Sequence, residues 1–175
     1  MHGSEITEQF LSAVALEVQG RSLYAEYAVS PRTVLHETAH QWMGDNVSVS
    51  DWSKDIWWVE GFAHFAESAF DDDGERRSGY EAVRRSCRGQ TPGDLSISEL
   101  FGDGSYVCGG LVFYALQQEV GDEVFWKILR TFNERFRYSN ASTDDLVATA
   151  SAVSGKDLQK FFESWLFGPL PDLPG

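Results

Sequence analysis

Apolar residues recur at intervals of three and four positions along most of this chain, and that spacing predicts amphipathic helices. The pattern is helical almost throughout the second half. The predicted helices there cover residues 81–88, 106–120, 122–136, 143–154 and 156–166. Glycine-rich or Ser-Asn breaks separate them at residues 102–104, 121, 139–140 and 155. We therefore expect a mainly α protein.

The start of the chain has a different period. In SAVALEVQ, residues 12–19, Val14, Leu16 and Val18 alternate with small or polar residues, among them Glu17. Alternation with a period of two predicts a half-buried strand. A small β element should therefore precede the helices, with Glu17 on the face opposite the apolar side chains.

Two more helices are predicted between this strand and the later ones. Ser30 followed by Pro31 is typical of a helix N-terminus, with the serine as cap and the proline in the first turn. This helix should run to Gly44. After a loop, the second helix covers residues 55–70 and ends in an acidic turn, DDDGERR at 71–77.

The composition is that of a globular domain. Of the 175 residues, 42% are hydrophobic and 14% aromatic, and neither Gly nor Pro is in excess. Residues 1–175 are long enough to bury a core and are expected to form a single domain. The net charge of −13 repels phosphate backbones and anionic lipids, so nucleic acids and membranes are not expected as partners. It favours cationic ligands, including the protonated amino end of a peptide.

The sequence leaves the compartment open. No uncharged apolar run approaches the ~20 residues of a membrane span, and the N-terminus lacks the basic start and apolar core of a signal peptide. A signal could still lie in a preceding part of a longer protein. Cys87 and Cys108 form no CxxC motif. They could pair in an exported protein, but two isolated buried thiols are the favoured interpretation.

The segment VLHETAHQWMGD, residues 34–45, contains an HExxH motif. On a helix, His36 and His40 lie four residues apart on one face, so both imidazoles can bind one metal ion. Glu37 lies about 100° round the helix from His36. From there its carboxylate can act as general base on a water bound to that ion. The alternative is a pair of ordinary histidines on a helix face.

The second predicted helix offers further ligands. A catalytic zinc needs a third protein ligand and an open fourth position, and Glu60 follows His40 by twenty residues. His64 and Glu67 share the helix face of Glu60. Glu67 can orient a zinc-bound imidazole, and the alternative is a solvated helix charge. For His64, a surface or core position is favoured over a role at the metal.

The segments HETAHQWMGD at 36–45 and WVEGFAHFAE at 58–67 resemble the aminopeptidase N family of gluzincin zinc metallopeptidases, which includes the leukotriene hydrolase and membrane alanyl aminopeptidases. The resemblance is carried by HExxH, by the Gln-Trp and Gly-Asp pairs after it, and by Glu-Gly-Phe-Ala in the second helix. It implies that Glu37 is the catalytic base. It also implies one Zn²⁺ per chain, with the ligands His36, His40 and Glu60.

This sequence departs from the family pattern at the third ligand. The family has eighteen residues between the second histidine and the glutamate, whereas nineteen separate His40 from Glu60, and Val59 stands where asparagine is usual. We expect the extra residue to lie in a loop, DWSKDIW at 51–57, ahead of the second helix. A loop absorbs one residue at little cost, so Glu60 should still reach the metal.

Two further segments extend the resemblance. AVALEVQ resembles the exopeptidase strand of the family, which puts Glu17 at the glutamate that binds the free α-amino group of the substrate. SYVCGGLVFYAL resembles the segment whose tyrosine donates to the oxyanion, which gives that role to Tyr106, although Cys108 replaces the usual basic residue. A phenol suits the role because it stays protonated at neutral pH. The alternatives are a solvated edge-strand carboxylate for Glu17 and a core tyrosine for Tyr106.

The resemblance implies a thermolysin-like (gluzincin) catalytic domain, truncated on its N-terminal side and lacking the family's N-terminal β domain and C-terminal helical domain. The implied function is a zinc-dependent aminopeptidase that uses zinc-activated water to hydrolyse the first peptide bond of peptides with a free N-terminus. The missing domains of a full-length protein would be further partners. Two alternatives stay open, namely a zinc-stabilised fragment without activity and a gluzincin endopeptidase.

Overall fold

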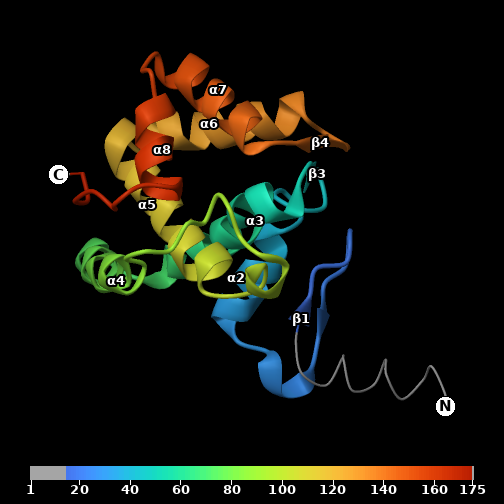
Figure 1. The fold of residues 1–175 in the computed structure, drawn as a ribbon. Helices are drawn as coiled ribbons and strands as arrows, with labels where there is room; N and C mark the ends of the chain where they lie inside the picture. Colours follow the sequence, from blue (N-terminus) through green and yellow to red (C-terminus); the bar gives the residue numbers. More distant parts are fainter. Residues whose placement is uncertain (1–14, 175) are drawn as a thin grey trace.

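Helix α3, Trp52–Glu67, crosses the middle of the molecule, and the other helices pack around it (Figure 1). The computed structural model describes residues 15–174. The first residues of the predicted strand, including Val14, therefore lie outside the described residues. From Asp55 to Ala63 every residue of α3 is buried, as expected for a helix that neighbours enclose on all sides.

The described chain is mainly helical, which confirms the fold class expected from its periodicity. Its α-helices are α2 (Pro31–Ala39), α3 (Trp52–Glu67), α4 (Asp73–Ser86), α5 (Gly109–Val120), α6 (Asp122–Arg135), α7 (Thr143–Ser154) and α8 (Gln159–Leu166). Short 3-10 helices cover Glu26–Ala28, Ser68–Phe70 and Ile97–Glu99, and a π-helical turn covers Gly104–Cys108. Within residues 15–174, no helix combines the length and the apolar character that a bilayer crossing requires.

Two small sheets lie at the edge of the helical body (Figure 1). Strand β1 (Ala15–Leu16), part of the strand predicted at the chain start, pairs antiparallel with β2 (Leu23–Tyr24). Strand β3 (Val47–Val49) pairs in parallel with β4 (Ser139–Ala141). The sequence predicts a loop where β3 lies, because three residues are too few to show a period and the partner strand is distant in the chain.

The helix that carries both histidines is shorter than predicted. It ends at Ala39 rather than near Gly44. Gly44 takes a φ of 134°, which residues with a β-carbon rarely adopt. The helix has already ended five residues before this glycine, and His40 is its C-cap.

The start of α3 corrects the prediction of a loop at 51–57. Asp51 accepts a hydrogen bond from the backbone N–H of Ser53 at 3.0 Å, and this cap starts the helix at Trp52. The expected loop is thus mostly helix. Helix α3 nevertheless presents Glu60 to both histidines.

The acidic turn predicted at 71–77 is the N-terminus of α4. The side chain of Asp72 accepts from the backbone N–H of Glu75 at 2.8 Å, and Glu75 accepts in return from the backbone N–H of Asp72. This reciprocal capping satisfies backbone donors that a helix start leaves free, and the acidic charges match the helix dipole.

Helix α5 crosses α3 so closely that only glycine fits at the contact. A β-carbon built on Gly61 would lie 2.4 Å from the carbonyl carbon of Gly109. One built on Gly109 would lie 2.5 Å from the carbonyl oxygen of Trp57. Because these obstacles are backbone atoms, they cannot rotate away. The crossing also sets the π-helical turn that precedes α5 against α3.

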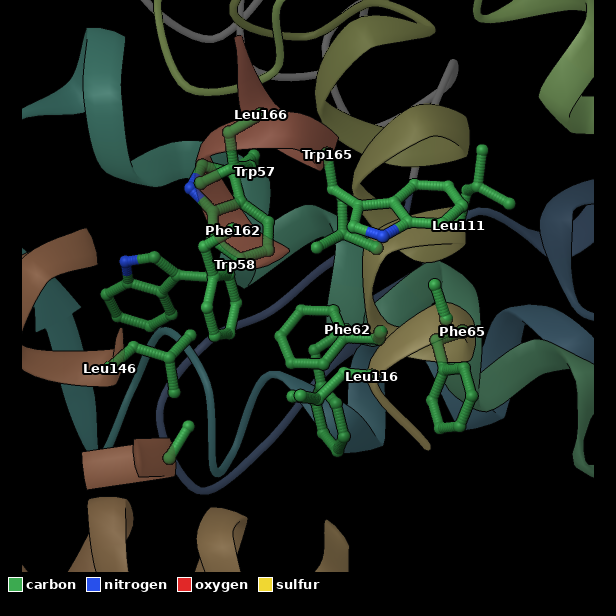
Figure 2. Packing of buried hydrophobic residues seen from close by; sticks show 14 of the residues in the cluster. Trp57, Trp58, Phe62, Phe65, Leu111, Leu116, Leu146, Phe162, Trp165 and Leu166 are labelled. Atoms are coloured by element: carbon green, nitrogen blue, oxygen red, sulfur yellow. The ribbon is translucent and has the colours of Figure 1, made fainter. Parts of the chain in front are cut away.

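Aromatic side chains hold α3 in place (Figure 2). The ring of Trp57 lies 5.6 Å from that of Phe113 on α5 and 6.3 Å from that of Phe162 on α8. Trp58 meets Phe132 of α6 edge-on, with 5.5 Å between the ring centres. Helix α3 is therefore a shared packing surface for three helices, and this fixes where its polar side chains point.

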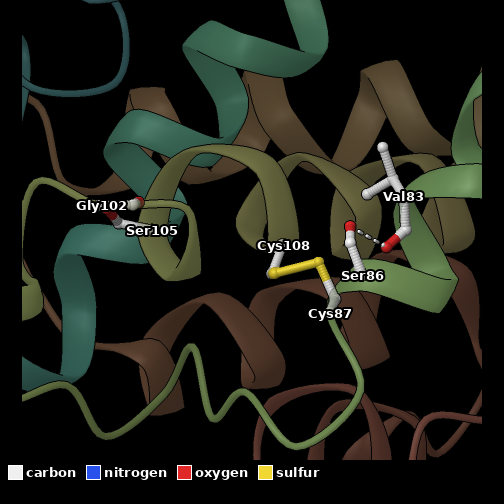
Figure 3. Close-up of a disulfide and its surroundings, with 6 residues drawn as sticks. All are labelled: Val83, Ser86, Cys87, Gly102, Ser105 and Cys108. Atoms are coloured by element: carbon white, nitrogen blue, oxygen red, sulfur yellow. Dashed lines mark hydrogen bonds between the residues drawn. A yellow bond between two sulfur atoms is a disulfide. The ribbon is translucent and has the colours of Figure 1, made fainter.

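Cys87 and Cys108 form a disulfide, so the prediction of two isolated thiols is wrong (Figure 3). Their Cα atoms lie 5.7 Å apart. Cys87 caps the C-terminus of α4 and Cys108 ends the π-helical turn. The pairing follows from how these two elements pack, which the spacing of the cysteines in the sequence does not encode.

Candidate metal centre and catalytic residues

Helix α2 presents His36 and His40 to α3. Its start is fixed by Ser30, whose hydroxyl accepts from the backbone N–H of Thr33 at 3.1 Å, and by Pro31 in the first turn, as predicted. His36 lies in the last turn, and His40 is the residue that ends the helix. Their ring centres lie 4.8 Å apart, so a single ion can contact both imidazoles.

Glu60 of α3 completes a cluster of three donors. Its Oε2 lies 3.5 Å from Nε2 of His36 and 3.4 Å from Nε2 of His40. Ligand atoms of a tetrahedral zinc, at bond lengths of 2.0–2.1 Å, lie roughly 3.3 Å apart. The three donor atoms, all within 4.8 Å of one another, therefore fit a zinc ion. The structure thus brings together the ligands implied by the resemblance.

The surroundings of Glu60 also favour a cation. The residue is 3% exposed, and none of the described residues donates a hydrogen bond to its Oε2. A buried carboxylate oxygen without a donor is costly unless positive charge lies beside it. A metal ion between this oxygen and the two imidazoles would remove that cost.

Contacts behind the histidines direct their Nε2 atoms at the cluster. Nδ1 of His36 lies 2.8 Å from Oε1 of Glu67, and Nδ1 of His40 lies 3.2 Å from the carbonyl oxygen of Met43. Because a carboxylate and a carbonyl only accept, each Nδ1 must carry the hydrogen. In the neutral imidazole this leaves the lone pair on Nε2, which is the tautomer that a metal needs.

The charges of the cluster are strongly coupled. Burial lowers the pKa of His36, but Glu60 and Glu67 outweigh burial and raise it to about 9. Burial would raise the pKa of Glu60, yet His36 and His40 lower it to about 2. The carboxylates that stabilise charge on the imidazoles would stabilise a divalent cation by the same field.

Glu37 lies beside the cluster with one oxygen unengaged. Its side chain is buried, and its Oε2 accepts no hydrogen bond from the described part of the chain. Burial raises the pKa of this carboxyl, against the opposing effect of His36 and His40. A carboxyl with a raised pKa and a free oxygen is suited to take up and release a proton.

Glu17, which directly follows β1, reaches the same region. Carboxylate oxygens of Glu17 and Glu37 and a ring nitrogen of His40 all lie within 4.8 Å of one another. Glu17 also lines a cavity of about 100 Å³ together with Asp45 and Glu60. The predicted strand therefore delivers its carboxylate to the metal cluster rather than to a remote edge.

Tyr106 covers the cluster from the π-helical turn. Its ring stacks on that of His36, with 5.7 Å between centres and 13° between planes. Burial raises the pKa of the phenol above its usual range, and the neighbouring Glu60 raises it further. The hydroxyl therefore remains a hydrogen-bond donor at neutral pH.

Some contacts of the site have no counterpart in the sequence analysis. The carbonyl of Met43 that orients His40 is a backbone group, so no residue type marks it. His64, favoured from sequence as a surface or core residue, is partly buried, and its Nδ1 lies 3.3 Å from the Oε1 of Glu67 that also meets His36. Its helical spacing from Glu67 is the feature that could have indicated this contact.

Comparison with known proteins finds one peptidase family. Residues 10–165 match the model of the peptidase family M1 domain. The chain is 28% identical over 183 residues to the tricorn protease-interacting factor F2 of Thermoplasma acidophilum, covering 94% of this chain and 23% of that protein. It is 34% identical over 149 residues to aminopeptidase M1 of Arabidopsis thaliana, covering 75% of this chain and 17% of that protein.

A solved structure has the same fold. A mutant M1 zinc metallopeptidase of Deinococcus radiodurans, bound to a Tyr-Ser-Ala substrate, superposes with a TM-score of 0.82 at 30% identity. The match covers 93% of this chain and 39% of that chain. The present chain thus spans less than a quarter of the two curated relatives above and well under half of the similar solved structure.

Proposed function

This chain belongs to peptidase family M1, and we propose that it carries the metal site and catalytic residues of a zinc-dependent aminopeptidase. The substrates would be peptides with a free amino end, and the chain would bind one zinc ion. The observation that carries this proposal is the juxtaposition of the donors of His36, His40 and Glu60 with the carboxylates of Glu37 and Glu17. The peptide substrate bound by the similar Deinococcus protein supports the substrate class.

His36, His40 and Glu60 would hold the zinc ion, and Glu67 would keep His36 oriented through its Nδ1. When bound, zinc would polarise the scissile carbonyl and lower the pKa of a water molecule at the open position. Side chains of this protein would carry out the other catalytic steps.

Glu37 would move the proton. Its unengaged oxygen would accept a proton from the attacking water as general base. The same carboxyl would then deliver that proton to the nitrogen of the leaving peptide. The burial that raises its pKa brings it closer to the range in which one group can do both.

Tyr106 would stabilise the negative charge that develops on the carbonyl oxygen. Its phenol stays protonated and stands over His36, so it can donate a hydrogen bond to that oxygen. The hydrogen bond from a donor already in position is strongest in the transition state, because the negative charge on the oxygen is largest there.

Glu17 would select the free amino end of the substrate. Its carboxylate lies next to those of Glu37 and Glu60, and such a group of acids attracts an ammonium ion. A substrate held by its terminal ammonium exposes only the first peptide bond to Glu37. This restriction would separate an aminopeptidase from an endopeptidase with the same metal site.

Zinc content per chain tests the metal site first. After exhaustive dialysis the wild type should retain one zinc ion, Glu60→Ala should lose it, and Glu123→Ala, an exposed acid on α6, should keep it. Loss in Glu60→Ala alone supports the three ligands. Retention of zinc in Glu60→Ala would move the third ligand to another residue such as Glu67 or His64.

Paired substrates then separate the possible activities. An aminopeptidase should cleave a peptide with a free amino end and spare the same peptide when its end is acetylated. Equal cleavage of both would identify an endopeptidase. A protein that binds zinc but cleaves neither peptide would be a zinc-stabilised fold without activity, and the proposed function would be wrong for this chain.

A further inference from the structure

Gln41 ties the strand that carries Glu17 to the helix that carries the histidines. It directly follows His40 in the sequence. Its side-chain oxygen accepts a hydrogen bond from the backbone N–H of Gly20 at 2.7 Å, and its Nε2 lies 3.4 Å from the carbonyl oxygen of Val18. One side chain thus contacts both halves of the turn between β1 and β2.

The orientation of this amide is fixed by its third contact. Nε2 of Gln41 also donates to Oδ2 of Asp45 at 2.7 Å. Both hydrogens of the NH₂ group therefore face acceptors, and the oxygen faces a donor. A flipped amide would point its oxygen at the Asp45 carboxylate and the Val18 carbonyl, which would cost all three contacts.

The turn held by Gln41 fixes the backbone next to Glu17. Val18 accepts from the N–H of Arg21 at 2.8 Å, and Gly20 at φ 77° takes the conformation that a tight turn needs. On the other side of Glu17, Leu16 pairs with Leu23 in the β1–β2 ladder. The Glu17 backbone is therefore held on both sides.

A second contact attaches the returning side of the same turn to α2. The hydroxyl of Ser22 donates to the carbonyl oxygen of Glu37 at 3.3 Å. Ser22 directly precedes β2, and continuing the register of Leu16 with Leu23 places it opposite Glu17. Gln41 joins Val18 and Gly20, on the Glu17 side of the turn, to the segment that follows the proposed metal ligands.

We infer that Gln41 is a positioning residue that sets the distance between Glu17 and the metal cluster, and thereby the preference for substrates with a free amino end. The effect on substrate preference rests on the proposed function. The tether, by which we mean the hydrogen bonds of the Gln41 side chain to the turn, is a property of the fold. Gln41 does not touch the reacting atoms in this assignment. It acts through the backbone on either side of Gly20.

Amide hydrogen exchange tests the tether without any need for activity. Gln41→Met keeps an unbranched side chain of similar length and removes all three contacts. The exchange of the Gly20 amide should then accelerate about fivefold, as expected for the loss of one hydrogen bond of about 1 kcal/mol. Gln159→Met, at a glutamine on α8 whose side chain donates to Glu163 within its own helix, should leave the exchange of the Gly20 amide unchanged. Equal exchange in wild type and Gln41→Met would overturn the assignment.

Kinetics with the paired peptides test the consequence for specificity. Gln41→Met should raise KM for the free-amine peptide, with kcat/KM falling roughly tenfold, about 1.4 kcal/mol. Zinc content and cleavage of the acetylated peptide should stay as in the wild type. In a Glu17→Gln background the same substitution should have no further effect on the preference.

The outcomes separate this assignment from the proposed function. A loss carried by kcat with KM unchanged, or a full effect of Gln41→Met in the Glu17→Gln background, would overturn the positioning role. If wild-type protein cleaves neither peptide, the proposed function fails and the link to substrate preference fails with it. In that case the exchange rate of the Gly20 amide alone tests whether Gln41 holds the turn.

Discussion

Two buried carboxylates, Glu60 and Glu37, belong to the candidate metal site, and their surroundings separate their proposed roles. For Glu60, the imidazoles of His36 and His40 outweigh burial and lower the pKa to about 2, so this group stays an anion. For Glu37, burial prevails and raises the pKa. An anion held between two imidazoles is suited to bind a metal. A carboxyl group whose pKa is raised towards neutral pH is suited to take up and release a proton.

We expect Glu37→Gln to bind zinc as the wild type does and to lose turnover. The amide preserves the shape of the side chain but cannot accept a proton, so kcat should fall by roughly 100- to 10,000-fold. Elemental analysis and the hydrolysis rate of a free-amine peptide measure the two effects. Glu123→Gln is the control for a surface acid. If Glu37→Gln lost zinc to the extent expected for Glu60→Ala, Glu37 would be a ligand and not the base.

At the scale of residues, the sequence predicts what helical geometry dictates. His36 and His40 share a face because they lie four positions apart, and that relation survives although α2 ends earlier than predicted. Glu60 lies beside both of them, 3.4 Å from Nε2 of His40, although its spacing from His40 is one residue longer than the family pattern. The contacts of Gln41 were not predictable, since they depend on where a separate hairpin docks.

Among the elements, the crossing of α3 and α5 determines the architecture of the site. Gly61 follows the proposed ligand Glu60 directly, and its backbone packs on Gly109, just after the π-helical turn that carries Tyr106. The same contact therefore sets the separation between a metal ligand and the proposed oxyanion donor. A side chain at this crossing would push the two apart.

We expect Gly61→Ala to lower the free energy of unfolding by roughly 1–3 kcal/mol, the usual cost of overpacking a core. The added methyl group would lie 2.4 Å from a backbone carbon, so no side-chain rotation relieves it. Gly79→Ala on α4 is the matched control, because a β-carbon there meets nothing within 4 Å. That variant should be neutral or more stable by up to about 1 kcal/mol. Equal denaturation midpoints for both variants in urea would contradict the close crossing.

The periodicity of the sequence predicts where helices form better than how they begin or join. Acids at 71–77 favour a turn, but Asp72 and Glu75 cap a helix instead, and both uses suit the same residue types. The Cys87–Cys108 disulfide joins α4 to the π-helical turn. Its formation depends on the packing of two helices, which a spacing of 21 residues cannot reveal.

On the scale of the whole molecule, long-range pairing was the least predictable feature. The parallel pair of β3 and β4 joins Val47–Val49 to Ser139–Ala141. Neither segment is long enough to show a periodic pattern of apolar residues. The net charge of −13 is likewise a property of the whole chain. This negative charge favours a ligand that carries an ammonium group. A bound metal ion would supply positive charge at the place where the fold brings acidic side chains together.

Metal binding should reverse the way in which the stability of the molecule depends on pH. In metal-free protein the folded-state pKa of His36 is raised to about 9, above the unfolded value of about 6.5. Protonated His36 therefore stabilises the fold fully below about pH 6.5, and this contribution is lost as pH rises towards 9. Zinc instead requires deprotonated imidazoles, so its contribution grows over the same range.

Thermal unfolding with excess zinc and with a chelator measures both trends. Free zinc at a hundred times its dissociation constant should stabilise the protein by about 2.7 kcal/mol, since the site exists only when α2 and α3 are packed together. The chelated protein should lose stability between about pH 6.5 and pH 9, and the zinc-loaded protein should hold or gain it. In Glu60→Ala the two curves should coincide. Parallel curves with a constant offset in the wild type would mean that zinc binds away from His36.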